Sequence, residues 1–82
     1  VNSTKSMVGH LLGASAAVEL VVTAMSVYHG KVHPTRNYTT PDPDCDLDYV
    51  PGAARELKIR NALSNSLGFG GHNVSILIGQ PD

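Results

Sequence analysis

Hydrophobic and polar positions divide the chain into an apolar first third, a polar and proline-rich middle and an alternating last quarter. From residue 11 to residue 28 apolar side chains occupy every face of a helical wheel, and Glu19 is the only charged residue. A helix that is apolar all round is normally buried inside a larger body. We therefore predict a buried helix here. N-cap oxygens are offered by Ser3, Thr4 and Ser6, and a C-cap by Gly30.

The same apolar stretch has to be compared with a signal peptide and with a membrane span. A signal peptide starts at a natural N-terminus, whereas this chain opens on Val1. A span needs about 20 nearly uninterrupted apolar residues. Glu19 lies in the middle of this stretch, with Thr23 and Ser26 nearby. These features favour a core helix, and we expect no membrane contact.

The remaining two thirds of the chain predict a loop followed by a β-hairpin. Four prolines between Val32 and Pro51 exclude a regular helix there. A short helical turn is expected at Ala53–Lys58. Asn61–Ser66 and Val74–Ile78 are predicted strands, the second rich in β-branched residues. The glycine-rich residues 68–73 would connect them.

Length and composition limit the functions that are compatible with the chain. Its 82 residues suffice for one small domain at most, and the net charge of −1 provides no basic face for nucleic acid. The single Cys45 rules out an internal disulfide and fits a reducing compartment. Because no initiator Met is present, we expect a fragment of a longer protein.

Lys5, His10 and Glu19 form the most informative polar group. A lone carboxylate in an apolar segment is costly to bury unless a cation or hydrogen bonds meet it. Lys5 is the nearest cation in sequence, so we predict a buried contact between Lys5 and Glu19. His10 at the helix start would then line an active-site wall. A histidine satisfied within the core remains an alternative for His10.

The Gly68-Phe69-Gly70-Gly71 run has two interpretations. It is compatible with a turn that needs positive φ. Alternatively, the glycines bring backbone N–H groups close to a ligand, with Phe69 as an apolar gate. A dinucleotide fingerprint is excluded, because a helix should follow and a strand does.

No metal or cofactor site is expected from the spacing of the acidic, histidine and cysteine residues. Four aspartates alternate like the start of a calcium loop, but glycine at the sixth and glutamate at the twelfth position are missing. The histidines lack zinc-type spacing. Cys45 lies between two carboxylates, which disfavour a thiolate, so we interpret it as structural. The aspartates are Asp42, Asp44, Asp46 and Asp48.

Several motifs, in a fixed order, resemble the β-ketoacyl-[acyl-carrier-protein] synthase family, and most closely its type II elongating members. Asn2–Ala14 resembles the Lys/His motif of that family. Pro34-Thr35, Asp44–Asp48 and Asn65–Asn73 follow in the family's order, with Leu67 where phenylalanine is usual. The resemblance covers residues 1–82 and implies the C-terminal segment of a synthase domain whose upstream part is missing.

The resemblance implies an α/β fold of the thiolase type, layered α-β-α-β-α. This chain would supply a buried helix and the glycine-loop hairpin. It further implies decarboxylative Claisen condensation of an acyl thioester with malonyl-[acyl-carrier-protein] in fatty-acid elongation. The expected partner is acyl carrier protein, and the full-length enzyme is expected to be a cytoplasmic homodimer without a cofactor.

The resemblance also assigns roles to individual residues. His10 corresponds to the second catalytic histidine, which donates from Nε2 to the enolate oxygen, and Lys5 gives electrostatic support with Glu19 as its partner. Phe69 corresponds to the residue whose N–H completes the oxyanion hole and whose ring gates the acyl pocket. The loop would move about Gly68, Gly70 and Gly71.

Several questions stay open at this level. The nucleophilic cysteine and the first histidine would lie upstream, so this segment alone is expected to be inactive. An aromatic polyketide ketosynthase and a noncatalytic chain-length subunit are the alternatives, and the residue at the upstream nucleophile position would distinguish the noncatalytic one. The six Lys and Arg are dispersed in sequence, which places carrier docking elsewhere.

Overall fold

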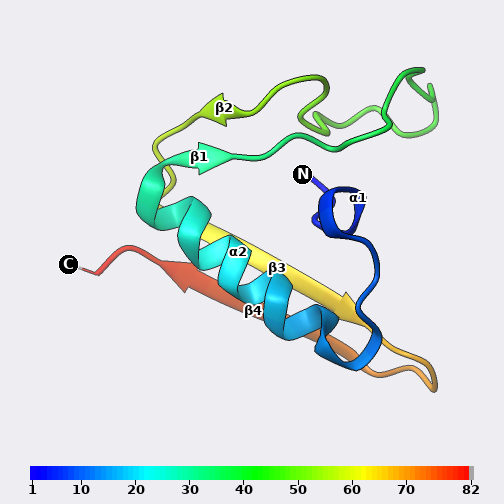
Figure 1. The fold of residues 1–82 in the computed structure, drawn as a ribbon, viewed down its shortest axis with the longest axis vertical. Coiled ribbons are helices and arrows are strands. Elements are labelled where there is room, and N and C mark those ends of the chain that lie inside the picture. Colours follow the sequence, from blue (N-terminus) through cyan, green and yellow to red (C-terminus); the bar gives the residue numbers. More distant parts are fainter. Residues whose placement is uncertain (82) are drawn as a thin grey trace.

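The computed structural model describes residues 1–81 and consists of a helix laid along a β-hairpin, with a smaller two-stranded ribbon beside it (Figure 1). The glycine loop of the hairpin and the start of the long helix lie at one end of the molecule. In chain order the elements are α1 (Lys5–Val8), the 3₁₀ turn η1 (Leu12–Ala14), α2 (Ser15–His29), β1 (Lys31–Val32), β2 (Arg55–Glu56), β3 (Asn61–Leu67) and β4 (Asn73–Gly79).

The predicted hairpin is confirmed, with both strands slightly longer than expected. β3 and β4 pair antiparallel from Asn61 opposite Gly79 to Leu67 opposite Asn73. Alternate β3 residues are half-buried and exposed, as expected for a strand covered on one face. The half-buried residues are Ala62, Ser64 and Ser66. α2 packs on the hairpin, mainly against β3.

The long helix ends as predicted but begins later. Gly30 adopts φ 64°, and its N–H donates to the Ser26 carbonyl at 2.9 Å, as a left-handed C-cap does. Of the expected N-cap residues, Ser3 and Thr4 precede the short α1 and Ser6 lies within it, and neither helix has a side-chain N-cap bond. Gly9, at φ 80°, ends α1 and redirects the chain, so α2 starts only at Ser15.

The predicted helical turn at Ala53–Lys58 is wrong. Arg55 and Glu56 form β2, which pairs antiparallel with β1, and the Leu57 N–H donates to the Gly30 carbonyl at 2.8 Å. Pairing with a strand distant in sequence has overridden the local helical preference. The loop between the two strands is irregular, as expected.

Within residues 1–81 the molecule buries little, and the prediction of a buried helix holds only for one side of α2. The exposed side carries Val21 at 62%, Met25 at 52% and Tyr28 at 81% exposure. Leu12–His29 is long and apolar enough to cross a bilayer by length and composition, a test that core helices also pass. One packed face and the ion pair formed by Glu19 fit a core helix.

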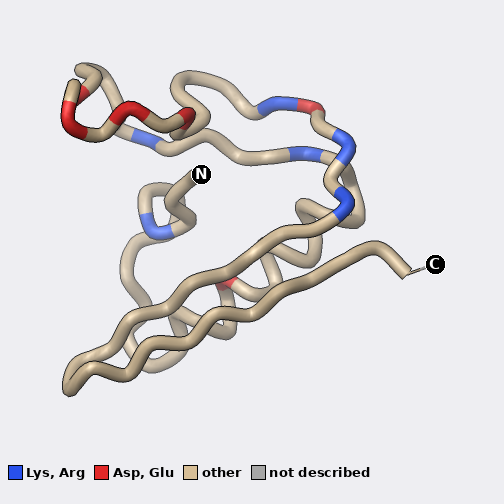
Figure 2. Tube along the Cα trace, turned by 180° about the vertical axis from the view of Figure 1, so that it is seen from behind, with Lys and Arg blue, Asp and Glu red and all other residues tan. Residues whose placement is uncertain are grey.

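Charged residues are segregated in space, which corrects the interpretation that the cations are dispersed. Figure 2 shows most Lys and Arg gathered along β1, β2 and the segment that leads into β3, with Glu56 of β2 among them, while four aspartates lie at the distant end of the loop. Four of the six cations belong to these elements, namely Lys31, Arg55, Lys58 and Arg60.

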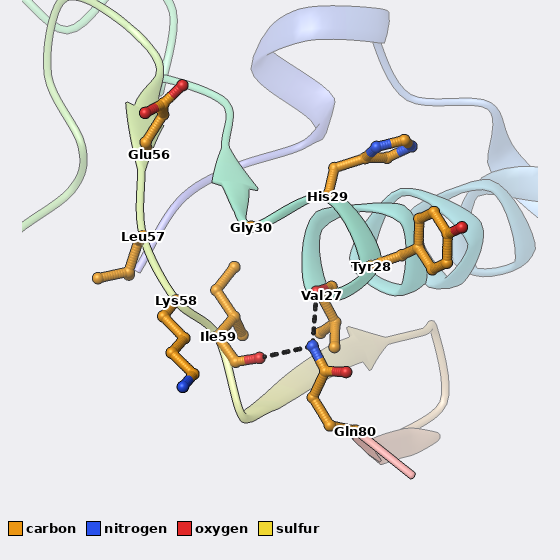
Figure 3. Close-up of a pocket in the computed structure, with 9 residues that line it drawn as sticks. All are labelled: Val27, Tyr28, His29, Gly30, Glu56, Leu57, Lys58, Ile59 and Gln80. Carbon is orange, nitrogen blue, oxygen red and sulfur yellow. Dashed lines mark hydrogen bonds between the residues drawn. The ribbon is translucent and has the colours of Figure 1, made fainter.

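A cavity of about 560 Å³ lies at the C-terminal end of α2 (Figure 3). The Gln80 side chain closes one side of it by donating to the carbonyls of Val27 at 3.0 Å and Ile59 at 3.3 Å. These bonds satisfy one of the free carbonyls at the helix end and fix the chain after β4. The cavity is at the opposite end of α2 from His10, and we assign it a structural role.

Candidate functional site

His10 is held in one tautomer by the backbone. It lies exposed in the turn between α1 and η1, and the Leu12 N–H donates to its Nδ1 at 2.9 Å. A ring nitrogen that accepts this bond carries no proton, so the neutral imidazole has its proton on Nε2. The core alternative for His10 does not match this exposed position. Nε2–H is therefore free to donate outward.

The Leu12 N–H that orients His10 is placed by an unusual backbone conformation at Leu12. Leu12 has φ 53°, in the left-handed region that few residues other than glycine adopt. Such outliers persist only where the surrounding structure enforces them, and they gather at functional sites. No feature of the sequence indicated this conformation, and Leu12 was missed as a site residue.

The structure brings His10 and the glycine loop together around one apolar cavity of about 450 Å³. The helix and the hairpin run side by side, so the start of α2 meets the turn between β3 and β4 (Figure 1). The Phe69 side chain is fully exposed at this cavity. The residues that line the cavity are His10, Leu12, Gly13, Leu67, Gly68 and Phe69.

The glycine loop is a tight turn, as one of its two interpretations required. Gly70 and Gly71 have φ of 81° and 84°, and the Gly68 N–H donates to the His72 carbonyl at 2.6 Å. Neither Gly70 nor Gly71 lines the cavity, whereas Gly68 and Phe69 do. Ligand binding by the loop stays a prediction.

The predicted contact between Lys5 and Glu19 is confirmed. The Lys5 Nζ donates to Glu19 Oε1 at 2.6 Å, with side-chain exposures of 39% and 12%. Glu19 Oε2 and Ser15 Oγ, one helical turn apart, have no hydrogen-bond partner among residues 1–81. The carboxylate is therefore anchored on one oxygen only within this part of the chain.

The ion pair does not line the His10 cavity. Glu19 contributes instead to a separate polar cavity of about 210 Å³, together with Thr23 and Ser64. Lys5 lines neither of the two cavities. The structure thus separates the apolar cavity with His10 and Phe69 from a polar one with Glu19. This separation agrees with a supporting role for Lys5, which stays a prediction.

A second network, which the sequence did not indicate, ties the residues before His10 to the start of the long loop. The Arg36 N–H donates to Ser6 Oγ at 2.8 Å, and the Ser3 N–H donates to Thr35 Oγ1 at 3.3 Å. His33 adds contacts to the same segment. These bonds position the motif that carries Lys5.

The acidic loop does not form a metal site among residues 1–81, where no three ligand side chains converge. The Asp44 N–H donates to Asp42 Oδ1 at 2.9 Å, so the loop forms an Asx turn. Cys45 is a free, exposed thiol.

The Arg55 guanidinium, followed by the Val50 N–H, holds the pKa of the Asp48 carboxyl well below its usual range. The Asp48–Arg55 pair joins the end of the acidic loop to β2 and has no part in the cavity with His10.

Comparison with known proteins gives one concordant result. Residues 1–39 match the family described as the C-terminal domain of β-ketoacyl synthases. The chain is 60% identical over 76 residues to 3-oxoacyl-[acyl-carrier-protein] synthase 2 of Synechocystis sp., covering 93% of the chain and 18% of the relative. It is 56% identical over 77 residues to the synthase of the same name from Staphylococcus aureus, covering 94% of the chain and 19% of the relative.

Two solved structures share the fold. One, described as a type II polyketide acyl-carrier protein in complex with its ketosynthase, superposes with a TM-score of 0.93 at 47% identity, over 99% of this chain and 20% of that one. The other, the ishigamide ketosynthase/chain length factor, gives 0.94 at 37% identity, with the same coverage. The chain spans about a fifth of the length of the relatives it matches.

Proposed function

Since this chain is homologous to the C-terminal part of β-ketoacyl synthases, we propose that it is the C-terminal segment of a longer fatty-acid elongating synthase. The reaction joins an acyl thioester to malonyl-[acyl-carrier-protein] with loss of carbon dioxide. The single observation that carries the proposal is the His10 tautomer, with Nε2–H free beside an apolar cavity. Identity to the two 3-oxoacyl-[acyl-carrier-protein] synthases, 60% and 56%, exceeds the 47% and 37% found for the two solved ketosynthase structures.

The proposed chemistry has two stages. An upstream cysteine thiolate first takes the acyl group from one carrier thioester, which releases that carrier thiol. The malonyl group then loses carbon dioxide, and the electron pair of the broken C–C bond forms an enolate. The enolate carbon attacks the acyl thioester, and the cysteine thiolate leaves as the new C–C bond forms. The product is a β-ketoacyl thioester on the second carrier.

His10 serves the decarboxylation in this proposal. Negative charge develops on the malonyl thioester oxygen as the enolate forms, and a donor fixed in advance stabilises that charge without reorganisation. Its Nε2–H is such a donor, because Leu12 occupies Nδ1. A neutral imidazole has a single N–H, which it uses for this hydrogen bond. His10 therefore acts here as a hydrogen-bond donor and not as an acid that gives up a proton.

Phe69 and the glycine loop serve the acyl group. The exposed Phe69 ring stands at the mouth of the apolar cavity, where it would cover a hydrocarbon chain. We propose that its N–H completes the oxyanion hole, and that Gly68, Gly70 and Gly71 allow the loop to open. Glycine has no Cβ and adopts both signs of φ, so the backbone at these positions can change conformation at little steric cost.

We propose that the helix and the hairpin are one part of an α-β-α-β-α layered fold of the thiolase type. The outer face of the hairpin exposes Leu63 at 56%, Leu67 at 79% and Leu77 at 70%, and α2 has an open apolar side. Apolar faces of this kind are normally covered by another layer. Upstream residues of the same chain would supply that layer, and the full-length enzyme would be a homodimer.

The proposed partner is acyl carrier protein, and one of the structural neighbours is a ketosynthase in complex with such a carrier. The basic residues of β1 and β2 lie at the end of the molecule away from the glycine loop (Figures 1 and 2). A carrier docked there would be far from His10, so we place carrier docking on upstream residues.

A cytoplasmic location is proposed, and the free thiol of Cys45 fits it.

The test of this proposal uses the full-length protein with acyl- and malonyl-carrier protein, and mass spectrometry of the carrier. A β-ketoacyl carrier two carbons longer than the acyl donor is the expected product. Malonyl decarboxylation without any condensed product would indicate the noncatalytic chain-length alternative. Repeated condensation to a polyketide on one carrier would indicate the polyketide ketosynthase.

A further inference from the structure

One half-buried imidazole, His33, holds the segment that leads into Lys5. Its Nε2 lies 3.0 Å from Thr4 Oγ1, and its Nδ1 lies 2.9 Å from the Pro34 carbonyl. The Asn2 amide nitrogen donates to the His33 carbonyl at 2.9 Å and lies 3.4–3.5 Å from both ring nitrogens. The imidazole is therefore in contact with neighbouring polar groups at both nitrogens.

These contacts define the protonation of the ring. A carbonyl can only accept, so the His33 Nδ1 next to Pro34 carries a proton. In the neutral ring Nε2 is then an acceptor, and Thr4 donates its hydroxyl proton to it. His33 thus has the opposite tautomer to His10. The bond fixes the residue directly before Lys5.

The helix that carries Lys5 depends on such external anchors. α1 has four residues, buries none of them and has no side-chain N-cap bond. An isolated helix of this length is unstable in water, so its position is set by tertiary contacts. Those contacts are the ion pair from Lys5 to Glu19, the bond between Ser6 and the Arg36 N–H, and the bond from Thr4 to His33.

We propose that His33 is a positioning residue for the condensation reaction, acting through Thr4 on the Lys5–Glu19 pair and on the turn that presents His10. The inference rests on the proposed function. His33 does not line the cavity with His10 and Phe69, so it acts through other residues and not on the reacting atoms.

The test compares four variants of the full-length enzyme in malonyl-carrier protein decarboxylation. His33→Leu and Thr4→Val each remove one partner of the bond and are expected to lower kcat about 3- to 10-fold, with KM within about 2-fold. His33→Gln places an acceptor oxygen near the Nε2 position and should restore most of kcat. The double variant Thr4→Val/His33→Leu should lose no more than either single one.

The matched control is His29→Leu, which removes an exposed histidine at the far end of α2 and should leave kcat unchanged. Equal losses in His33→Leu and His33→Gln, additive losses in the double variant, or an unchanged kcat in His33→Leu would each overturn the proposal. All variants are compared by thermal melting, and a loss of kcat that follows the melting temperature across the series counts against positioning.

A second readout does not require activity. The rate at which an amine-reactive reagent labels Lys5, followed by mass spectrometry, should rise at least about 2-fold in His33→Leu and Thr4→Val and stay constant in His29→Leu. Unchanged labelling of Lys5 would overturn the positioning role. If the wild-type protein does not decarboxylate malonyl-carrier protein, the proposed function fails, and the labelling result still decides the role of His33.

Discussion

At the scale of single residues, the polar side chains near the N-terminus of this chain divide into one group that faces a cavity and another that holds it in place. His10 faces the apolar cavity and is oriented by the Leu12 N–H. The Lys5 Nζ lies 2.6 Å from Glu19 Oε1, and neither residue lines that cavity. The sequence predicted the ion pair because a lone carboxylate in an apolar helix needs a partner. It did not predict Leu12, since a positive φ at leucine leaves no compositional trace.

The ion pair should be energetically coupled. Lys5→Met leaves the buried Glu19 carboxylate without its cation and should cost the full-length enzyme about 2–3 kcal/mol of unfolding free energy. Glu19→Gln removes the charge and should cost less. In the double variant the losses should fall short of additivity by about 1–2 kcal/mol, measured from chemical unfolding midpoints. Additive losses would mean that the contact contributes no stability.

The Asp48–Arg55 pair predicts a pH dependence at the acidic end. The pKa of Asp48 in the folded protein lies below its ordinary value of 3.8, so the pair contributes stability that is complete above pH 3.8. The contribution is lost as the pH falls through the folded pKa. Arg55→Gln should raise the Asp48 pKa toward 3.8, as measured by carbon-13 NMR titration of labelled aspartates. An unchanged Asp48 titration in that variant would contradict the pairing.

At the scale of elements, the hairpin and the end of α2 were predictable because their signals are local. β-branched residues marked the second strand, the glycine-rich residues 68–73 marked the connection between the strands, and Gly30 marked the C-cap. Two features were not predictable. The start of α2 depends on how Gly9 redirects the chain. The β1–β2 ribbon depends on pairing between strands that are more than 20 residues apart.

Substitutions at Gly70 test the turn between β3 and β4, which carries Phe69. The Gly70 φ of 81° disfavours any side chain, although a Cβ there would meet only ordinary contacts at 3.7 Å from the His72 ring. Gly70→Ala should therefore cost about 1–2 kcal/mol through backbone strain alone. Gly70→Asn, whose side chain tolerates this region, should cost less. Thermal melting of both variants in the full-length enzyme checks the order, and equal stability of Ala and glycine would contradict the turn.

At the scale of the whole molecule, the amount of exposed apolar surface limits what the 82 residues do alone. Only Val27 and Val50 are buried hydrophobic residues within the described part of the chain. The sequence predicted this need for a partner from a helix that is apolar on every face. It did not reveal that the cations gather on one side, because that depends on how β1 and β2 come together.

The isolated 82-residue chain should accordingly be inactive in condensation and poorly folded. A core of this size does not offset the conformational entropy of ordering the chain. Circular dichroism with a denaturant titration would show a broad, weakly cooperative transition. A sharp two-state transition of the monomer would contradict this expectation.

The most direct measurement of the central claim is the release of carbon dioxide from malonyl-carrier protein by the full-length His10→Ala variant. Loss of one donor aimed at the enolate oxygen should slow decarboxylation about 10²- to 10³-fold. Acyl transfer from carrier protein to the upstream cysteine should stay within a few-fold of the wild-type rate. Decarboxylation at the wild-type rate would contradict the role assigned to His10, and with it the account of this site.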